Sequence, residues 1–163
     1  MVRRNQKGFS LIELLIVVAI ILIIAAIAIP NLLRSRMAAN EASAVSAVRT
    51  ITTSEHAYFQ AYPHIGFTCS LTDLGPPASG QPYSETGAGI LDAVVATGTK
   101  AGYSYGLSGC TGTPVVATYT STATPVIVGG TGQRAFCSDA SGVVRYAEDG
   151  TTATCLANQK VLQ

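Results

Sequence analysis

Length, composition and charge limit what this chain can be. It has 163 residues, a formal net charge of +1, and charged side chains at only 12% of its positions. This length accommodates one modest domain together with a membrane segment. A net charge this close to zero provides no strongly positive surface for phosphates. We therefore do not expect the chain to bind nucleic acid through its overall charge.

Residues 9–30 form the most apolar stretch, and we assign them as a transmembrane and assembly helix. Phe9 to Ile29 spans about 21 residues, close to the roughly 20 that a helix needs to cross the hydrocarbon core. Glu13 is the only charged residue in the stretch. Insertion scales assign roughly 2.5 to 3.5 kcal/mol to such a group at the centre of a membrane helix. Glu13 lies near the start, where it can reach the headgroups, but this cost indicates a further role.

Basic residues flank the apolar stretch: Arg3, Arg4 and Lys7 precede it, and Arg34 and Arg36 follow it. The positive-inside rule then favours a cytoplasmic N-terminus, with the rest of the chain outside the cytoplasm. A secretory signal cleaved around residues 25–28 is the alternative. The apolar run exceeds the roughly 7 to 15 residues of such a signal and contains Glu13, which argues against cleavage there.

Residues 31–62 are predicted to continue as an amphipathic helix. Apolar side chains recur at spacings of three, four or seven, at Leu33, Met37, Ala44, Val48, Ile51, Tyr58 and Tyr62. Pro30 can kink the helix, but no glycine or turn cluster separates the two halves, and Pro63 is the next clear stop. We therefore expect one long helix whose second half is covered by the remaining chain.

Residues 63–163 are rich in Gly, Ser, Thr and Pro and are predicted to form a β-rich globular head. A short helix is expected within residues 90–98, after a loop. Four antiparallel strands are expected at residues 102–107, 115–122, 134–139 and 142–148. A hairpin turn at residues 139–142 joins the last two strands. The predicted fold class is α+β, a long N-terminal α-helix packed on a small antiparallel β-sheet head.

Four cysteines, Cys69, Cys110, Cys137 and Cys155, include no C-x-x-C pair and no nearby histidine at metal-ligand spacing. They predict two disulfides in an oxidising compartment, with three possible connectivities. The segment from Gly102 to Gly106 matches the G-x-S-x-G pattern of serine hydrolases. That chemistry requires a histidine further along the chain, and His56 and His64 lie upstream. We therefore predict no enzymatic activity and no cofactor.

The segments "KGFSLIELLIVVAI" and "AAIAIPNLLRSR" resemble the N-terminus of type IV pilins and of type II secretion pseudopilins. The head stretch "TATPVIVGGTGQRAFCSDASGVVRY" shares a looser likeness with pilin-like proteins. The resemblance implies that residues 1–8 are a leader, which a prepilin peptidase cuts after Gly8 before it N-methylates Phe9. Glu13 then matches the glutamate that engages the N-terminal amine of a neighbouring subunit during assembly.

Two positions depart from that family pattern. Ser10 stands where the family commonly has threonine, and Leu22 where it commonly has glycine. Ser10 keeps a hydroxyl group, whereas Leu22 removes a glycine that loosens a helix, so local unwinding on assembly would depend more on Pro30.

The resemblance implies a filament subunit of a type IV pilus, held in the bacterial inner membrane with a periplasmic head before assembly. Its partners would be copies of itself, the prepilin peptidase and an inner-membrane assembly platform. A pseudopilin of a type II secretion system is the first alternative. A membrane-tethered periplasmic binding or catalytic domain is the second.

The same resemblance bears on metal and disulfide bonds. Major pseudopilins hold calcium in a C-terminal loop, which makes Asp139, Glu148 and Asp149 calcium candidates, although their spacing matches no recognisable calcium loop. For the cysteines we expect Cys69 with Cys110 and Cys137 with Cys155. The second bond would hold a C-terminal segment with few large apolar residues, and pilin-like heads often tie down that region with a disulfide.

Overall fold

The computed structural model describes residues 9–157 and 160–162. The chain divides between Ser35 and Arg36 into two compact units. Helix α1, Leu11–Ala61, begins in the first unit and ends in the second. Its bounds lie within two residues of the helix predicted from Phe9 to Tyr62.

The first unit consists of the apolar half of α1. This helix is long and apolar enough to cross a membrane, with a mean hydropathy of 3.3 over 18 residues and none of that window buried. Pro30 lies inside the helix. Because proline has no backbone N–H, the carbonyl of Ala26 lacks its usual hydrogen-bond donor. The chain is nevertheless helical on both sides of Pro30.

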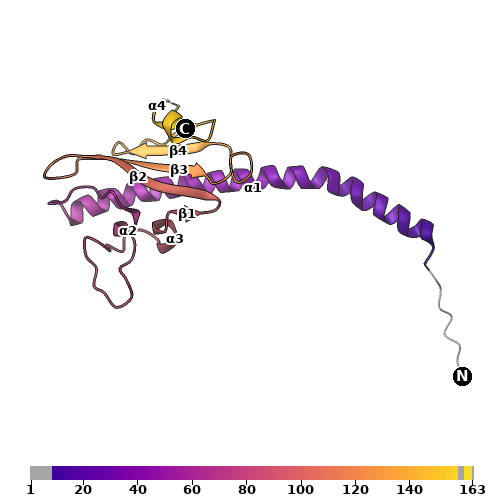
Figure 1. Ribbon diagram of the computed structural model, residues 1–163, viewed down its shortest axis with the longest axis horizontal. Coiled ribbons are helices and arrows are strands. Elements are labelled where there is room, and N and C mark those ends of the chain that lie inside the picture. Colours follow the sequence, from indigo (N-terminus) through magenta and orange to yellow (C-terminus); the bar gives the residue numbers. More distant parts are fainter. Residues whose placement is uncertain (1–8, 158–159, 163) are drawn as a thin grey trace, which may run out of the picture. The chain divides into compact units, whose positions relative to one another are not determined.

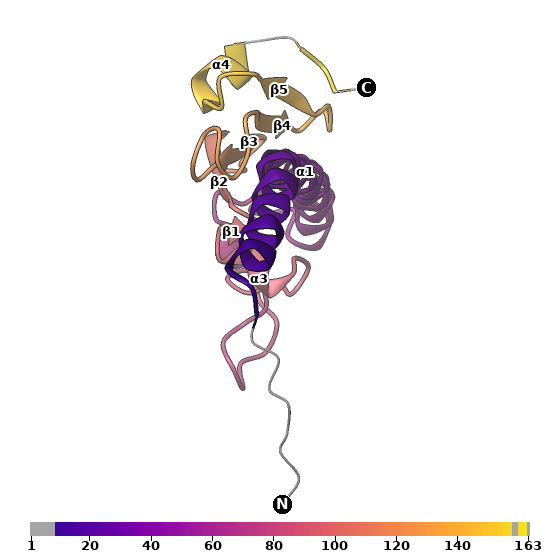
Figure 2. The same ribbon diagram turned by 90° about the vertical axis from the view of Figure 1, so that its right-hand side faces the viewer.

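The second unit contains one antiparallel sheet in the order β1-β2-β3-β4-β5. The strands are β1 Thr99–Lys100, β2 Tyr103–Thr111, β3 Thr118–Pro125, β4 Ala135–Asp139 and β5 Arg145–Ala147. Figure 2 shows this order across the sheet. The sequence predicted four strands, and β1 is the additional one. It escaped prediction because two residues carry no periodic pattern; a tight turn with Ala101 at φ 51° and Gly102 at φ 73° pairs it with β2.

Alternating side chains give the sheet two different faces. In β3, Tyr119, Ser121 and Ala123 are buried, whereas the threonines between them are partly exposed. The buried face packs against the second half of α1, as Figure 1 shows. Ala44, Val48, Ile51 and Tyr58 of α1 share one core with Tyr103, Tyr105, Ala123 and Phe136 of the sheet. Burying each large apolar side chain contributes roughly 1.5 to 3 kcal/mol, so this core holds α1 to the sheet.

Three short helices complete the second unit: α2 Leu71–Leu74, α3 Ala93–Ala96 and α4 Thr152–Ala157. Helix α3 lies within the predicted residues 90–98, and Asp92 caps it by accepting a hydrogen bond from the Val94 N–H at 2.9 Å. Helices α2 and α4 were not predicted, because they lie in segments rich in Ser, Thr and Gly that lack an apolar run such as the one that indicated α3.

Helix α4 covers part of the sheet face that points away from α1. Ala135 and Cys137 alternate with Phe136 along β4, so they lie on the opposite face from the core that contains Phe136. They pack with Ala147 of β5 and Cys155 of α4 in a second, smaller apolar cluster. The sheet is therefore covered on one face by α1 and partly on the other by α4.

An ion pair between buried Glu41 and partly exposed Arg134 fastens α1 to the residue before β4. Glu41 is 8% exposed and accepts hydrogen bonds from the N–H groups of Gln133 and Arg134 at 2.9 and 3.1 Å. The Arg134 guanidinium donates to the same carboxylate at 2.7 and 2.8 Å and lies over the rings of Phe136 and Tyr146. Burial alone would raise the pKa of Glu41, but these hydrogen bonds and the Arg134 charge outweigh it and lower the pKa.

This ion pair predicts an acid-sensitive contribution to stability. Because the folded-state pKa of Glu41 lies below its usual value, its stabilisation is present above about pH 4.5 and is lost as the pH falls through the lowered value. Glu41→Gln should reduce the free energy of unfolding by about 2 kcal/mol at neutral pH and flatten its acid-side decline. Urea denaturation of the full chain in detergent micelles, followed by tyrosine circular dichroism, measures both effects.

Glu148→Gln is the matched control for this prediction. Glu148 pairs with Lys160 at 2.9 Å, but both side chains are more than half exposed, and exposed pairs contribute little. An equal loss of stability in the two variants would show that the Glu41 contacts do not anchor α1.

Candidate functional site

The first turn of α1 contains Glu13, the carboxylate whose charge is costly to place in a membrane. The Ser10 N–H donates a hydrogen bond to Glu13 Oε2 at 2.9 Å, and the Ser10 carbonyl accepts from the Leu14 N–H at 3.2 Å. Glu13 therefore satisfies a backbone donor at the start of its own helix, as a glutamate does in a capping box. A negative charge is also favourable beside the positive end of the helix dipole.

The candidate cleavage point adjoins this turn. Phe9 is 74% exposed and directly precedes Ser10. Gly8 and the rest of residues 1–8 lie outside the described residues. Pro30, the third assembly candidate, lies 17 positions after Glu13 on the same helix and so does not belong to the first turn.

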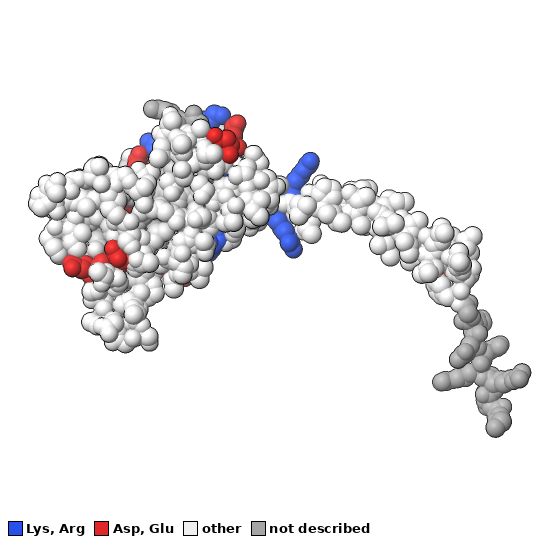
Figure 3. Space-filling view, viewed as in Figure 1, with Lys and Arg blue, Asp and Glu red and all other residues white. Residues whose placement is uncertain are grey.

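The first unit presents an almost continuous apolar surface. Among its described residues, 9–35, seventeen large apolar side chains are exposed: Phe9, Leu11, Ile12, Leu14, Leu15, Ile16, Val17, Val18, Ile20, Ile21, Leu22, Ile23, Ile24, Ile27, Ile29, Leu32 and Leu33. Figure 3 shows this segment as an almost uncharged surface. Each such side chain gains roughly 1.5 to 3 kcal/mol when it is taken out of water, so lipid or protein has to cover this surface.

Two disulfides hold the outer parts of the head. Cys69 bonds to Cys110 and joins the chain after α1 to β2, and Cys137 bonds to Cys155 and joins β4 to α4. This is the pairing that we expected from the sequence. The second bond lies within the small cluster of Ala135, Cys137, Ala147 and Cys155 and fixes α4 against the sheet.

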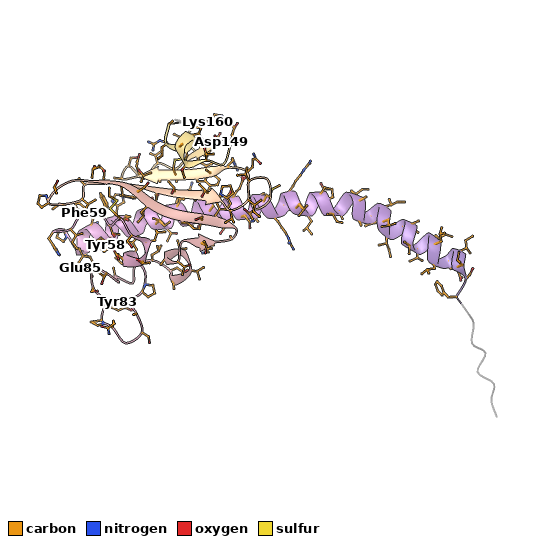
Figure 4. The ribbon with its side chains drawn as sticks, viewed as in Figure 1. Tyr58, Phe59, Tyr83, Glu85, Asp149 and Lys160 are labelled. Atoms are coloured by element: carbon orange, nitrogen blue, oxygen red, sulfur yellow. A yellow bond between two sulfur atoms is a disulfide. The ribbon has the colours of Figure 1, made fainter. Side chains whose placement is uncertain are left out.

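The three calcium candidates each contact other partners. Asp139 pairs with Arg145 at 2.7 Å, and Glu148 pairs with Lys160 at 2.9 Å. Asp149 accepts hydrogen bonds from Thr151, which precedes α4, and from Thr154 in the first turn of α4. Figure 4 labels Asp149 and Lys160 at this end of the head. Within residues 9–157 and 160–162, no group of three acidic, histidine or cysteine side chains is placed to hold a metal ion.

The G-x-S-x-G segment lies on a regular strand. Ser104 is exposed in β2 between buried Tyr103 and Tyr105, so this segment is a strand, as predicted for residues 102–107. Strand β2 continues to Thr111, so no helix follows Ser104 as a nucleophile elbow requires. His56 packs edge-on against Phe67, and His64 lies 3.4 Å from Glu85.

Two buried glutamates were not singled out by the sequence. Glu41 and Glu55 both lie on the buried side of the second half of α1. The available signal was spacing: Glu41 precedes buried Ala44 by three residues, and Glu55 follows buried Ile51 by four. Helical phase alone thus places both carboxylates on the face that packs against the sheet.

Comparisons with known proteins find a family match in the N-terminal segment that contains the first turn of α1. Residues 3–29 match the family model described as the prokaryotic N-terminal methylation motif. The type IV wide pilus major component PilA4 of Thermus thermophilus is 68% identical over 38 residues, which are 23% of this chain and 29% of that protein. The type IV major pilin protein PilA of Myxococcus xanthus is 43% identical over 55 residues, which are 34% of this chain and 25% of that protein. No solved structure matches the chain significantly.

These matches confirm the resemblance of the N-terminus to prepilin-type proteins. The chain carries the methylation motif, and the residues that match it include the apolar helix up to Ile29. The matched segments span about a quarter of the length of the curated relatives, 29% and 25%. They amount to 23% and 34% of this chain.

The bond between Cys137 and Cys155 predicts a local effect on the head. Cys155→Ser should make the C-terminal region sensitive to protease and lower the free energy of unfolding by about 3 kcal/mol, because it removes a constraint on the unfolded chain. The double variant Cys137→Ser with Cys155→Ser is the control for a newly freed thiol. Limited proteolysis and peptide mapping under non-reducing conditions measure the effect. A peptide that links Cys69 to Cys137 would contradict the pairing.

Proposed function

We propose that this chain is the structural subunit of a type IV pilus-like filament, made as a precursor and cut after Gly8. Polymerisation would proceed through the apolar half of α1. The observation that carries the proposal is the uncovered apolar helix with one carboxylate in its first turn, inside the segment that matches the methylation motif. Both relatives are named as major type IV pilus proteins, which supports a pilus subunit as the proposal.

The apolar surface would be covered by lipid before assembly and by neighbouring subunits afterwards. Before assembly, lipid would cover it, with the N-terminus on the cytoplasmic side of the inner membrane and the head in the periplasm. Two disulfides suit that oxidising compartment. In the filament, the same helices of neighbouring copies would cover one another. Transfer from lipid to protein changes the apolar environment little, so polar groups have to direct the packing.

Glu13 is the polar group that would direct it. Cleavage after Gly8 would create a new amine on Phe9. This amine lies one residue before the Ser10 N–H, which already donates a hydrogen bond to Glu13. An amine and a carboxyl group are both mostly charged in water at neutral pH. In a packed core of apolar helices, each charge would be costly alone, and pairing offsets the cost. The Glu13 carboxylate of one copy would therefore engage the Phe9 amine of the next.

The first prediction of this proposal concerns processing. Mass spectrometry of the mature protein should find Phe9 as the N-terminal residue, heavier by one methyl group. Cleavage by the prepilin peptidase, followed by N-methylation, accounts for both features. A mature protein that starts at Met1, or near Asn31, would rule out this maturation.

A second prediction separates membrane insertion from assembly. Glu13→Val should insert at least as well as the natural chain, because it removes a charge that costs about 3 kcal/mol at the helix centre and less near its start, yet it should reduce filaments strongly. Glu13→Gln keeps an acceptor for the Ser10 N–H and removes only the charge, so it should also lose filaments. Membrane fractionation and electron microscopy of surface filaments measure the two outcomes.

Glu148→Gln provides the control, since it neutralises an exposed carboxylate on the head and should leave filaments intact. Filaments of Glu13→Gln at natural levels would show that helix capping is the whole role of Glu13. The pseudopilin alternative is favoured if the natural strain shows no surface filaments and if protein secretion requires this chain.

A further inference from the structure

Glu55 is a carboxyl group buried in the head without a full set of partners. It lies on α1 and is 0% exposed. Its Oε2 accepts a hydrogen bond from the Thr68 N–H at 3.0 Å. Its Oε1 is buried and has no hydrogen-bond partner among the described residues. A buried carboxylate is stable only when it is well paired, so a single donor leaves the ionised form of Glu55 poorly compensated.

The charge of a neighbouring residue that acts on Glu55 is the negative one of Asp73. Thr68 also donates its hydroxyl to Asp73 Oδ2 at 3.0 Å, so Thr68 lies between two carboxyl groups. The titratable groups that face Glu55 are Asp73 on α2, Tyr119 on β3 and Tyr58 on α1. Burial raises the pKa of Glu55 to about 7, the Thr68 hydrogen bond opposes the rise, and the Asp73 charge adds to it.

The Glu55 contact holds one defined segment, Gly66–Asp73, which we call the Thr68 segment. At one end, Gly66 bridges to Val116, and the Phe67 N–H donates to the Val116 carbonyl at 3.0 Å. The Phe67 ring packs against Phe59 of α1 and Tyr119 of β3. The Thr68 N–H bonds the backbone of the segment to a side chain of α1, and the Gly66 N–H donates at 3.1 Å to the carbonyl of Tyr62, which directly follows α1.

We propose that Glu55 is a proton-controlled latch, which holds the Thr68 segment on α1 while it is neutral and favours local opening of that segment once it is ionised. The proposal does not depend on filament assembly, because every group in it belongs to the head. The disulfide from Cys69 to Cys110 keeps the opening local, since it still ties the segment to β2.

The direction of the pH effect follows from the two states of Glu55. In the open state, water reaches the carboxyl group and its pKa returns towards 4.5. Closure is therefore fully favourable below about pH 4.5 and becomes less favourable as the pH rises to about 7. Above pH 8 the carboxylate is ionised in both states, so the opening equilibrium no longer changes with pH.

Amide hydrogen exchange of the full chain in detergent micelles tests the latch. Peptides that cover the Thr68 segment are compared with a β3–β4 peptide of the same molecule, which corrects for the intrinsic pH dependence of exchange. Between pH 5 and pH 8 the opening constant of the segment should rise on the order of 50-fold, then level off. Glu55→Gln keeps an acceptor for Thr68 and cannot ionise, so its opening constant should stay constant.

Two further variants sharpen the test. Glu85→Gln removes an exposed carboxylate near His64 and should behave like the natural chain. Asp73→Asn keeps an acceptor for the Thr68 hydroxyl and removes a like charge, so the midpoint of the transition should move to lower pH. The proposal is overturned if Glu55→Gln retains the pH response, or if the carbon-13 signal of the Glu55 carboxyl titrates below pH 5.

Discussion

Exclusion of water from the apolar side chains of α1 is the constraint on which the molecule depends. Between Ala44 and Tyr58, the sheet and the segments after α1 cover the apolar stripe and create the core of the head. Between Phe9 and Leu33, the described residues leave the side chains exposed. One continuous helix thus carries a surface that the chain itself covers and another that requires lipid or protein from outside.

Three glutamates on α1 show how strongly the environment decides the role of one side chain. Glu13 accepts a hydrogen bond from its own first turn and is exposed. Glu41 is buried, but Arg134 and two backbone N–H groups compensate its charge. Glu55 is more deeply buried and receives one donor. The first is suited to recognition, the second to anchoring and the third to sensing protons.

The sequence predicted the large elements well because their patterns are long. The apolar run and the helical stripe predicted α1, and the alternating β-rich runs predicted β2 to β5. Strand β1 and helices α2 and α4 lie in segments rich in Gly, Ser and Thr without an apolar or alternating run, and β1 and α4 depend on a tight turn and a disulfide. For Glu41, helical phase indicates the buried direction, but its partner Arg134 is 93 positions away, and no local pattern connects the two.

The two edges of the sheet have a consequence for how copies of this chain can associate. Strand β1 has two residues and β5 has three, and the C-terminal segment pairs with β5 through Arg145 and Val161. An outermost strand this short or already paired offers little template for a strand from another molecule. On the β1 side, however, only Tyr103 and Ser104 of β2 are paired with β1, which leaves the outer edge of β2 from Gly106 to Thr111 uncovered by it. Edge-to-edge pairing between heads is therefore disfavoured along β5 and restricted to the second half of β2.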